Sequence, residues 1–514
     1  MLHRTNVALV LPFLLLAIGP VEGSGIAIAG KAQPEPLRIR FDALSAERGL
    51  SVSITTRGDH DGQTTFSNRS FATYKGQQSA VDVRIDADGK PLQAIRGARG
   101  WTVRHAPDAM LTVNYRLPTS GPTLIDAGVA DWVRPWVRDG AFDLVGDTAW
   151  LLPTGRSDDD AVALSIDATR VADDRRFVSS FGPGAVLHDA DVTRGQIGRA
   201  LYEGGAIGLA VRNTPSGRIG VVWSAMAPTI HAREMQDDAF AILGAERAFF
   251  HDSQPWYLVS VHGGARRDPK VNLGGGTGLT HSFAMFAKPD LDFGVAEERE
   301  HFRWVLSHEY FHQWNGLTLR VASLPGRNDD DYTSVYWFSE GFTEFYAMRL
   351  LTRAGLQTPD RADDVLNDKL ERYARNRLRN VGVEAAGPLF LTDADAEQIP
   401  YLRGYLAAWQ VDLAMRRASG GARSLDDVMR AFVARAKAEP RFRVTTELLL
   451  AELGKGMPAR DAEALRHLIL MGGDPALDAN SFSPCLRGKL QDFGHAKAWQ
   501  YSFVSASRTD CFRY

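Results

Sequence analysis

Alternation of apolar and polar positions dominates residues 37 to 223. Apolar side chains occupy every second position in stretches such as Leu111–Leu117, which is typical of strands that bury one face. Turn signals separate these stretches: Asp88-Gly89 follows one of them, and Asn213-Thr-Pro-Ser-Gly217 between two apolar runs predicts a hairpin. The pattern predicts an all-β N-terminal domain over residues 34–228.

The pattern changes near residue 230, where helical spacing of apolar residues begins. A compact strand candidate, Trp256–Val261, and a glycine-rich loop at 274–276 interrupt it. Long amphipathic segments predict a mainly helical second domain with a small sheet, over residues 229–475. The helical segments are Asp237–Phe250, Val295–Trp314, Glu340–Ala354, Asp364–Leu378, Tyr401–Arg416 and Leu425–Ala438.

The N-terminus has the layout of a signal peptide. His3 and Arg4 precede an apolar run that ends at Ile18, and small residues follow. Cleavage after Gly23, or as late as Ala29, would fit, and an uncleaved anchor is the alternative. We therefore expect an exported protein, periplasmic or secreted, without a further membrane span.

Composition narrows the classes of partner. The 514 residues include 59 Lys and Arg and 62 Asp and Glu, without long blocks of one sign. Neither a nucleic-acid footprint nor a polybasic membrane patch stands out. The two cysteines, Cys485 and Cys511, could form a disulfide in an oxidising compartment or remain free thiols. They lie in a C-terminal stretch, 476–514, that is too short for another full domain.

His308-Glu-Tyr-Phe-His312 carries the clearest chemical signal in the sequence. Spacing by four residues places the two imidazoles one helical turn apart on one face, where both can bind one metal ion. The competing interpretation is a core helix with two buried histidines. Glu309 points elsewhere around the helix, so it can act as general base on a metal-activated water.

A second acidic segment supports the metal site. Glu340 opens another amphipathic helix, 28 positions after His312, and can complete a His2Glu ligand set that leaves a fourth position for water. A structural zinc site would more often use cysteines, so the prediction is one catalytic zinc ion per chain. Glu344, one turn later, suits either a carboxylate that supports a ligand histidine or a solvated helix face.

Three stretches together resemble the gluzincin metallopeptidases, and among them the glycyl aminopeptidase family, peptidase family M61. They are His308-Glu-Tyr-Phe-His-Gln-Trp-Asn315, Trp337-Phe-Ser-Glu-Gly-Phe-Thr-Glu-Phe345 and Tyr401-Leu-Arg-Gly-Tyr-Leu-Ala-Ala-Trp-Gln-Val-Asp-Leu413. The resemblance implies an α+β multidomain protein, with a sandwich-like β domain before a thermolysin-like catalytic domain. It also implies that Tyr401 stabilises the oxyanion. The related M1 aminopeptidases are the second candidate, although they join the two motif helices by a shorter insert.

The chain departs from the family at the sheet edge that is expected to line the cleft. Family members carry Gly-x-Glu-His there, and the glutamate is expected to anchor the α-ammonium of the substrate. The matching residues are Gly278, Thr280 and His281, and a neutral hydroxyl cannot pair with a cation as a carboxylate does. Related proteins also often append a PDZ domain, which residues 476–514 cannot hold.

These observations predict zinc-dependent hydrolysis of peptide bonds in a peptide or protein substrate. Aminopeptidase specificity does not follow, because Thr280 lacks the expected charge. Two alternatives stay open: a catalytically degenerate peptide-binding protein, and hydrolysis of a bond other than a peptide bond. The sequence indicates neither the side-chain preference nor the oligomeric state.

Overall fold

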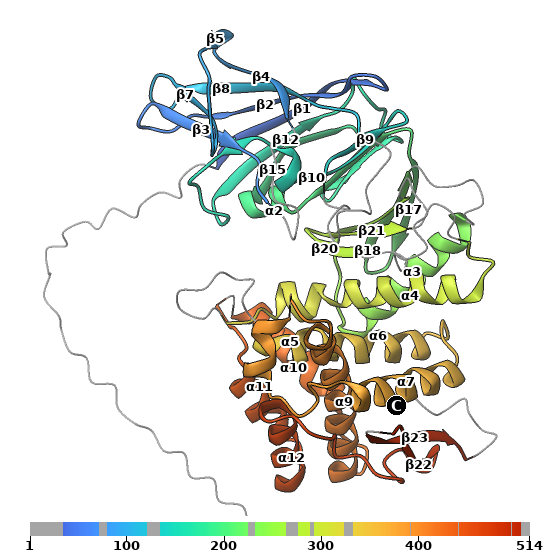
Figure 1. Cartoon of the computed structure of the whole chain (residues 1–514). Helices are drawn as coiled ribbons and strands as arrows, with labels where there is room; N and C mark the ends of the chain where they lie inside the picture. Colours follow the sequence, from blue (N-terminus) through green and yellow to red (C-terminus); the bar gives the residue numbers. More distant parts are fainter. Residues whose placement is uncertain are drawn as a thin grey trace, which may run out of the picture.

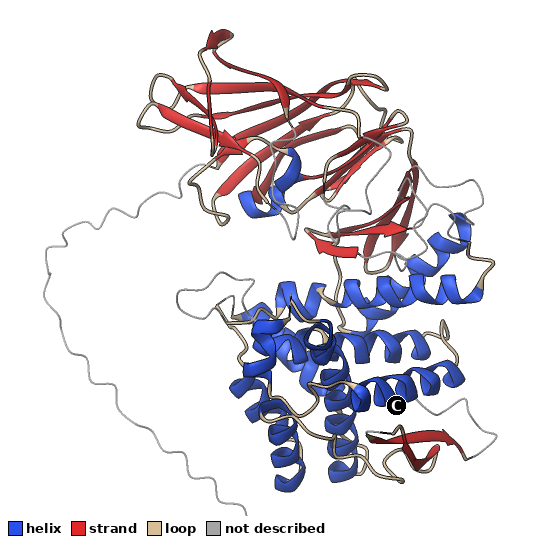
Figure 2. Ribbon diagram, viewed as in Figure 1, coloured by secondary structure: helices blue, strands red, loops and turns tan. Residues whose placement is uncertain are grey.

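The computed structural model describes residues 34–70, 80–120, 134–224, 232–263, 276–287, 292–322, 333–390, 392–439, 441–494 and 496–504. The expected signal peptide therefore lies outside the described residues. A β-rich region lies at the top of Figure 1, a helical region lies at the bottom, and a further sheet lies between them (Figures 1 and 2). An N-terminal β region followed by a helical region was predicted and is confirmed.

Three sheets build the β-rich region. The largest has the order β15-β12-β1-β2-β8-β4-β5, in which only β1 and β12 pair in parallel. Its strands are Val186–Thr193, Ala161–Asp167, Glu35–Ser45, Gly49–Arg57, Met110–Leu117, Val81–Ala87 and Lys90–Leu92. As predicted, apolar side chains on β8 alternate with more exposed ones, and the turn at Asp88-Gly89, with positive φ at both residues, joins β4 to β5.

The other two sheets of this region are smaller. The second has the order β14-β13-β16-β10-β9, with strands Gly182–Pro183, Phe177–Ser179, Leu201–Gly205, Ala141–Val145 and Trp136–Arg138. The third has the order β11-β3-β7-β6, with strands Leu152–Pro153, Gln63–Ser67, Gly100–Arg104 and Ile95–Gly97. Two short helices, α1 (Gly146–Ala149) and α2 (Arg194–Gly198), connect strands of the region.

The middle sheet has the order β17-β18-β19-β21-β20. Its strands are Gly208–Thr214, Gly217–Ser224, Trp256–Gly263, Ser282–Ala287 and Gly276–Leu279. The hairpin predicted around Asn213–Gly217 is confirmed as β17–β18. β18 also pairs in parallel with β19, which follows it in the chain after α3 (Ala232–Phe249), so strand pairing joins the hairpin to the sheet of the second region. Turn residues identify a hairpin but do not identify its sheet. The domain limits 34–228 and 229–475 stay predictions.

The helices follow the middle sheet in layers. The sheet contacts α4 (Ala296–Phe311), α4 contacts α6 (Gly341–Arg353), and α6 contacts α7 (Pro359–Arg375), as Figure 1 shows. The remaining helices are α5 (Tyr336–Ser339), α8 (Val383–Ala386), α9 (Ala394–Ser419), α10 (Leu425–Ala438), α11 (Thr446–Gly454) and α12 (Ala459–Leu470). Short helical turns η2 (Gln313–Thr318), η4 (Thr333–Val335) and η5 (Gly387–Leu389) lie between them.

The buried apolar side chains form separate cores in the β-rich region and in the helical region. One core fills the β-rich region, and a second extends from the inner face of the middle sheet through the helices. A small third cluster, which includes Leu201, Val222 and Leu279, joins the outer face of the middle sheet to the second β sheet. The edge strand β20 is therefore fixed between the two regions, next to α4.

The C-terminal residues form a hairpin, β22 (Leu486–Asp492) and β23 (Lys497–Phe503), that packs against α7. Asn367 exchanges hydrogen bonds with the backbone of Tyr501, with N···O distances of 2.7 and 2.9 Å. The sequence left open whether the cysteines form a disulfide or remain free thiols. Cys485 is disulfide-bonded, and Cys511 lies outside the described residues. Among the described residues, no helix combines the length and apolar character needed to cross a membrane.

Candidate metal centre and active site

Helix α4 carries the first two candidate ligands. His308 lies in its last turn, and His312 caps its C-terminal end. The apolar face of the helix, with Phe302, Val305 and Leu306, is buried in the core. His308 and His312 lie one turn apart, as their spacing predicts, and their Nε2 atoms are 3.2 Å apart.

Glu340 comes from the junction between α5 and α6. Its Oε2 lies 3.3 Å from the Nε2 of His308 and 3.5 Å from the Nε2 of His312. In a tetrahedral site with metal–ligand bonds of about 2.0 to 2.1 Å, neighbouring donor atoms lie roughly 3.3 Å apart. The three atoms thus form a triangle that fits one face of such a site. Among the described residues, this is the one group of three metal-type ligands whose donor atoms lie within 4.8 Å of one another.

Asn315 fixes His312 and connects the two ligand-bearing segments. Its backbone carbonyl accepts a hydrogen bond from the Nδ1 of His312 at 3.0 Å, which leaves the Nε2 lone pair free for a metal. Its amide nitrogen donates to the carbonyls of Phe338 and Ser339 and to the hydroxyl of Thr343, at 3.1 to 3.2 Å. One buried side chain therefore ties the turn after α4 to the turn that presents Glu340.

The electrostatics of the triangle favour a cation. Burial lowers the pKa of His312, but the charge and hydrogen bond of Glu340, with a smaller effect of Glu309, raise it to about 9. Burial raises the pKa of Glu340, but the two histidines outweigh this effect and hold it well below its usual range. A positive charge among these three side chains is therefore strongly stabilised.

Glu309 lies beside the triangle on the same helix. Burial raises the pKa of its carboxyl group, against the opposing influence of the two histidines. The backbone N–H of Gly278, on the edge strand β20, donates a hydrogen bond to this carboxylate. A carboxylate with a raised pKa, held by a fixed donor, can accept and return a proton near neutral pH.

Tyr401, in α9, packs against the ring of His308. The two rings are stacked with centroids 6.1 Å apart. Burial, and then the negative charges of Glu340, Glu309 and Glu344, raise the pKa of Tyr401 well above its usual value. The phenol therefore stays protonated and can donate a hydrogen bond to a developing negative charge.

A family model described as M61 glycyl aminopeptidase matches residues 301–385, which contain His308, Glu309, His312 and Glu340. The resemblance to peptidase family M61 is confirmed. With it, the assignment of the chain to the peptidases is supported. Among curated proteins, none matches the sequence.

Two solved structures share the fold of this chain. An aminopeptidase N family protein from Idiomarina loihiensis is 17% identical, with a TM-score of 0.70, over 88% of this chain and 79% of that chain. An M1 zinc metallopeptidase from Deinococcus radiodurans is 15% identical, with a TM-score of 0.51, over 86% of this chain and 95% of that chain. At these identities the likeness concerns the fold.

The three residues expected to bind substrate lie at and after β20. A Cβ at Gly278 would meet the backbone of Glu309 at 3.9 Å, so this part of the strand borders the candidate site. Thr280 directly follows the strand, and its N–H donates to the carbonyl of Arg199 at 2.8 Å. His281 occupies the turn to β21 with φ of 45°; the residue as a whole is exposed, but burial of its imidazole lowers the pKa of the ring. Gly278 thus borders Glu309 of α4, whereas His281 lies in the turn beyond the strand.

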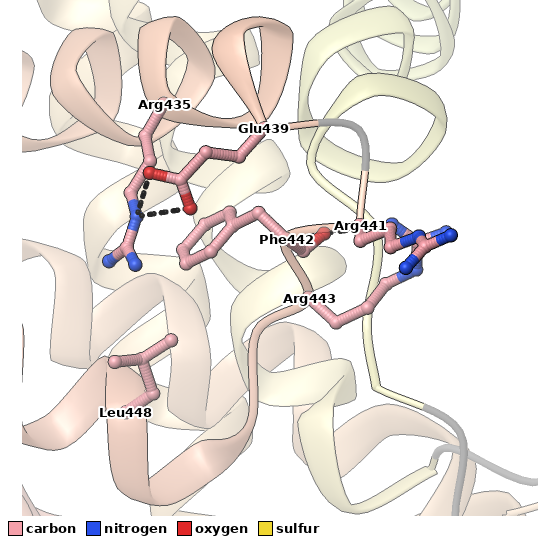
Figure 3. A pocket seen from close by; sticks show the side chains of 6 residues that line it. All are labelled: Arg435, Glu439, Arg441, Phe442, Arg443 and Leu448. Atoms are coloured by element: carbon pink, nitrogen blue, oxygen red, sulfur yellow. Dashed lines mark hydrogen bonds and ion pairs between the residues drawn. The ribbon is translucent and has the colours of Figure 1, made fainter. Parts of the chain in front are cut away.

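A cavity of about 750 Å³ lies elsewhere in the helical region. None of the candidate site residues lines it; its lining is Arg435, Glu439, Arg441, Phe442, Arg443 and Leu448 (Figure 3). Arg435 is paired with Glu439 at 3.3 Å and covers the ring of Phe442. The residues that line this cavity include no cluster of metal ligands, so the cavity is separate from the candidate metal site.

Proposed function

We propose that this chain is an exported, zinc-dependent peptidase of the gluzincin type that hydrolyses peptide bonds through a metal-activated water. The observation that carries the proposal is the triangle of His308, His312 and Glu340, with donor atoms 3.2 to 3.5 Å apart. Two imidazoles and one carboxylate, without cysteine, form the donor set of a catalytic rather than a structural zinc site.

When bound, zinc supplies a Lewis acid that polarises the scissile carbonyl and lowers the pKa of its water. Glu309 accepts a proton from that water as the water oxygen adds to the carbonyl carbon. The carbon–nitrogen bond then breaks, and the proton held on Glu309 passes to the leaving amine. The N–H of Gly278 holds Glu309 in place during both transfers.

Tyr401 donates its phenolic proton in a hydrogen bond to the oxygen that becomes negative during the addition. Its raised pKa supports this role, because the hydroxyl keeps its proton at neutral pH. Glu344 supports His308 from behind. No covalent intermediate with the protein is required.

The substrate in this proposal is a peptide or protein segment, without a requirement for a free α-amine. Thr280 supplies no negative charge at the end of β20, where the family resemblance calls for one. Recognition of the α-ammonium therefore lacks its expected partner at this position.

The decisive experiment combines metal analysis with one substitution. Purified protein should contain about one zinc per chain, and Glu309→Gln should lower kcat by about 10³-fold while zinc remains bound. Peptides with free and blocked N-termini should both be cleaved. Absence of stoichiometric zinc would favour the degenerate peptide-binding alternative, and substantial activity in Glu309→Gln would refute the assigned base.

Export rests on the N-terminal pattern alone. N-terminal sequencing of the protein from fractionated cells should find a mature chain that begins after Gly23 or as late as after Ala29. A full-length chain in the cytoplasmic fraction would contradict export without affecting the metal site.

A further inference from the structure

A lysine is buried close to the metal ligands. Lys369 lies on α7, in the layer behind α6, and is only 8% exposed. Lysine is rarely buried to this extent without a partner, because the ammonium group loses its hydration. The partner of Lys369 therefore indicates what the buried charge does.

The ammonium group of Lys369 contacts the carboxylate that lies behind His308. Its Nζ is 3.2 Å from Oε2 of Glu344, and the indole N–H of Trp304 donates to the same oxygen at 3.1 Å. The Nζ also lies 6.0 Å from the ring centroids of both Trp304 and Tyr405. Two donors thus hold one oxygen of Glu344 in place, and two aromatic rings flank the ammonium group that is one of these donors.

The other oxygen of Glu344 faces the metal ligand. Oε1 lies 3.9 Å from Nδ1 of His308, and among the described residues that nitrogen has no hydrogen-bond partner at normal distance. His312 differs, because its Nδ1 already donates to the carbonyl of Asn315 at 3.0 Å. Glu344 is therefore the acceptor available to orient His308, and its orientation depends on what holds its far oxygen.

We propose that Lys369 is a positioning residue for the metal centre: it fixes Glu344 so that the carboxylate aligns His308 for metal binding. The inference rests on the zinc site of the proposed function. Acceptors behind a ligand histidine fix its tautomer and raise its basicity, and their loss commonly weakens metal binding 10- to 100-fold. Lys369 acts one step further from the metal, through Glu344.

A role confined to packing would have different consequences. The contact between Lys369 and Glu344 joins α7 to α6, so its loss could destabilise the fold without changing metal affinity. The two roles separate when zinc affinity and thermal stability are measured on the same variants.

The test is a double-mutant cycle on the full chain. Zinc dissociation constants are measured by competition with a chromophoric chelator for the wild type, Lys369→Met, Glu344→Gln and the double variant. We expect about 10-fold weaker zinc binding in Lys369→Met. In the Glu344→Gln background, the same substitution should change zinc affinity by less than about twofold, because Lys369 acts only through the carboxylate.

Controls secure the interpretation. Lys369→Arg should restore most of the affinity, because it keeps the positive charge. Lys455→Met removes a lysine that contacts Glu452 at 2.7 Å in α11, and it should leave zinc affinity unchanged. If Lys369→Met does not fold, because Glu344 is then buried without its cation, the double variant avoids that charge and its affinity is compared with that of Glu344→Gln.

Two results would overturn the positioning role. One is zinc affinity in Lys369→Met within twofold of the wild type, and the other is an equal loss with and without the Glu344 carboxylate. Either result, with one zinc per wild-type chain, refutes the inference alone. A wild-type chain that binds no zinc refutes the proposed function as well.

Discussion

A partly buried glutamate in each region of the molecule has a lowered pKa, and the two are stabilised by different kinds of partner. Glu35, at the start of β1, accepts a hydrogen bond from Thr56 and pairs with Arg156 and Arg194. Burial raises its pKa, but the hydrogen bond from Thr56 and the two guanidinium groups outweigh this effect. Because arginine is permanently charged, the chain itself supplies the positive charge that stabilises the Glu35 carboxylate.

Glu340 has partners of another kind. Burial raises its pKa as well, but the groups that outweigh this effect are the imidazoles of His308 and His312. An imidazole is neutral near neutral pH unless its surroundings force a proton onto it, as they do for His312. The Glu35 cluster supplies its own cations, whereas the Glu340 cluster is proposed to accept one from outside. The comparison separates a cluster that is complete without a metal from one that is proposed to bind a metal, although both hold a partly buried carboxylate.

Glu340→Gln should have the largest effect of the substitutions that test this difference between the two clusters. The loss of a charged ligand should weaken zinc binding by more than about 100-fold, beyond the range for groups that only support a ligand. Zinc at 100 times its Kd stabilises the wild type by about 2.7 kcal/mol, and at the same concentration it stabilises Glu340→Gln by less than about 0.4 kcal/mol, so added zinc should raise the Tm of the wild type far more than that of Glu340→Gln. Differential scanning calorimetry with and without zinc measures both.

Glu35→Gln is the control for that experiment. Its zinc-dependent rise in Tm should equal that of the wild type, because the Glu35 cluster holds no site. An equal zinc response in Glu340→Gln and Glu35→Gln would contradict the assignment of Glu340 as a ligand.

Glu35→Gln should instead lower the free energy of unfolding by about 2 kcal/mol at neutral pH, because it leaves the buried guanidinium of Arg194 without its carboxylate and leaves Arg156 with Asp59 alone. The pKa of Glu35 is lower in the folded than in the unfolded chain, so its contribution is present above the unfolded value of about 4.5. That contribution is lost as pH falls through the folded value. Urea unfolding between pH 7 and pH 3 should therefore show the wild-type and variant curves converging on the acid side, and a constant difference would contradict the ion-pair explanation.

The sequence predicted the part of the site that follows from local spacing. His308 and His312 follow from the four-residue repeat on one helix, and the limits of α10 were predicted as Leu425–Ala438, as found. The start of α9 was wrong. It was predicted at Tyr401 and lies at Ala394, because Pro400 is accommodated inside the helix and Asp393 caps the true N-terminus.

The missed contributions depend on tertiary contacts. The N–H of Gly278 that holds Glu309 is a backbone group and has no signature in the sequence. Asn315 lay within a recognised motif, but its bridge to Phe338 and Thr343 exists only once two helices pack. Lys369, in a charged helical segment, has the sequence context of a solvent-exposed lysine, and only the packing of α7 on α6 brings it to Glu344.

Thr280→Glu should have the smallest effect of these substitutions. It adds a second carboxylate that can pair with a cation from outside the chain, in this case the α-ammonium of a substrate. Thr280 follows β20 two residues after Gly278, which borders Glu309, and its backbone is fixed to the carbonyl of Arg199. A carboxylate at this position can pair with the α-ammonium of a substrate, and an exposed pair of this kind contributes about 0.2 to 1 kcal/mol. The ratio of kcat/KM for free-amine over N-acetylated peptides should rise about twofold to fivefold, mainly through a lower KM.

Thr280→Gln is the control, because glutamine has nearly the same shape as glutamate but carries no charge. It should leave the ratio unchanged. An equal rise in Thr280→Gln would mean that size, not charge, at position 280 governs which peptide termini are accepted.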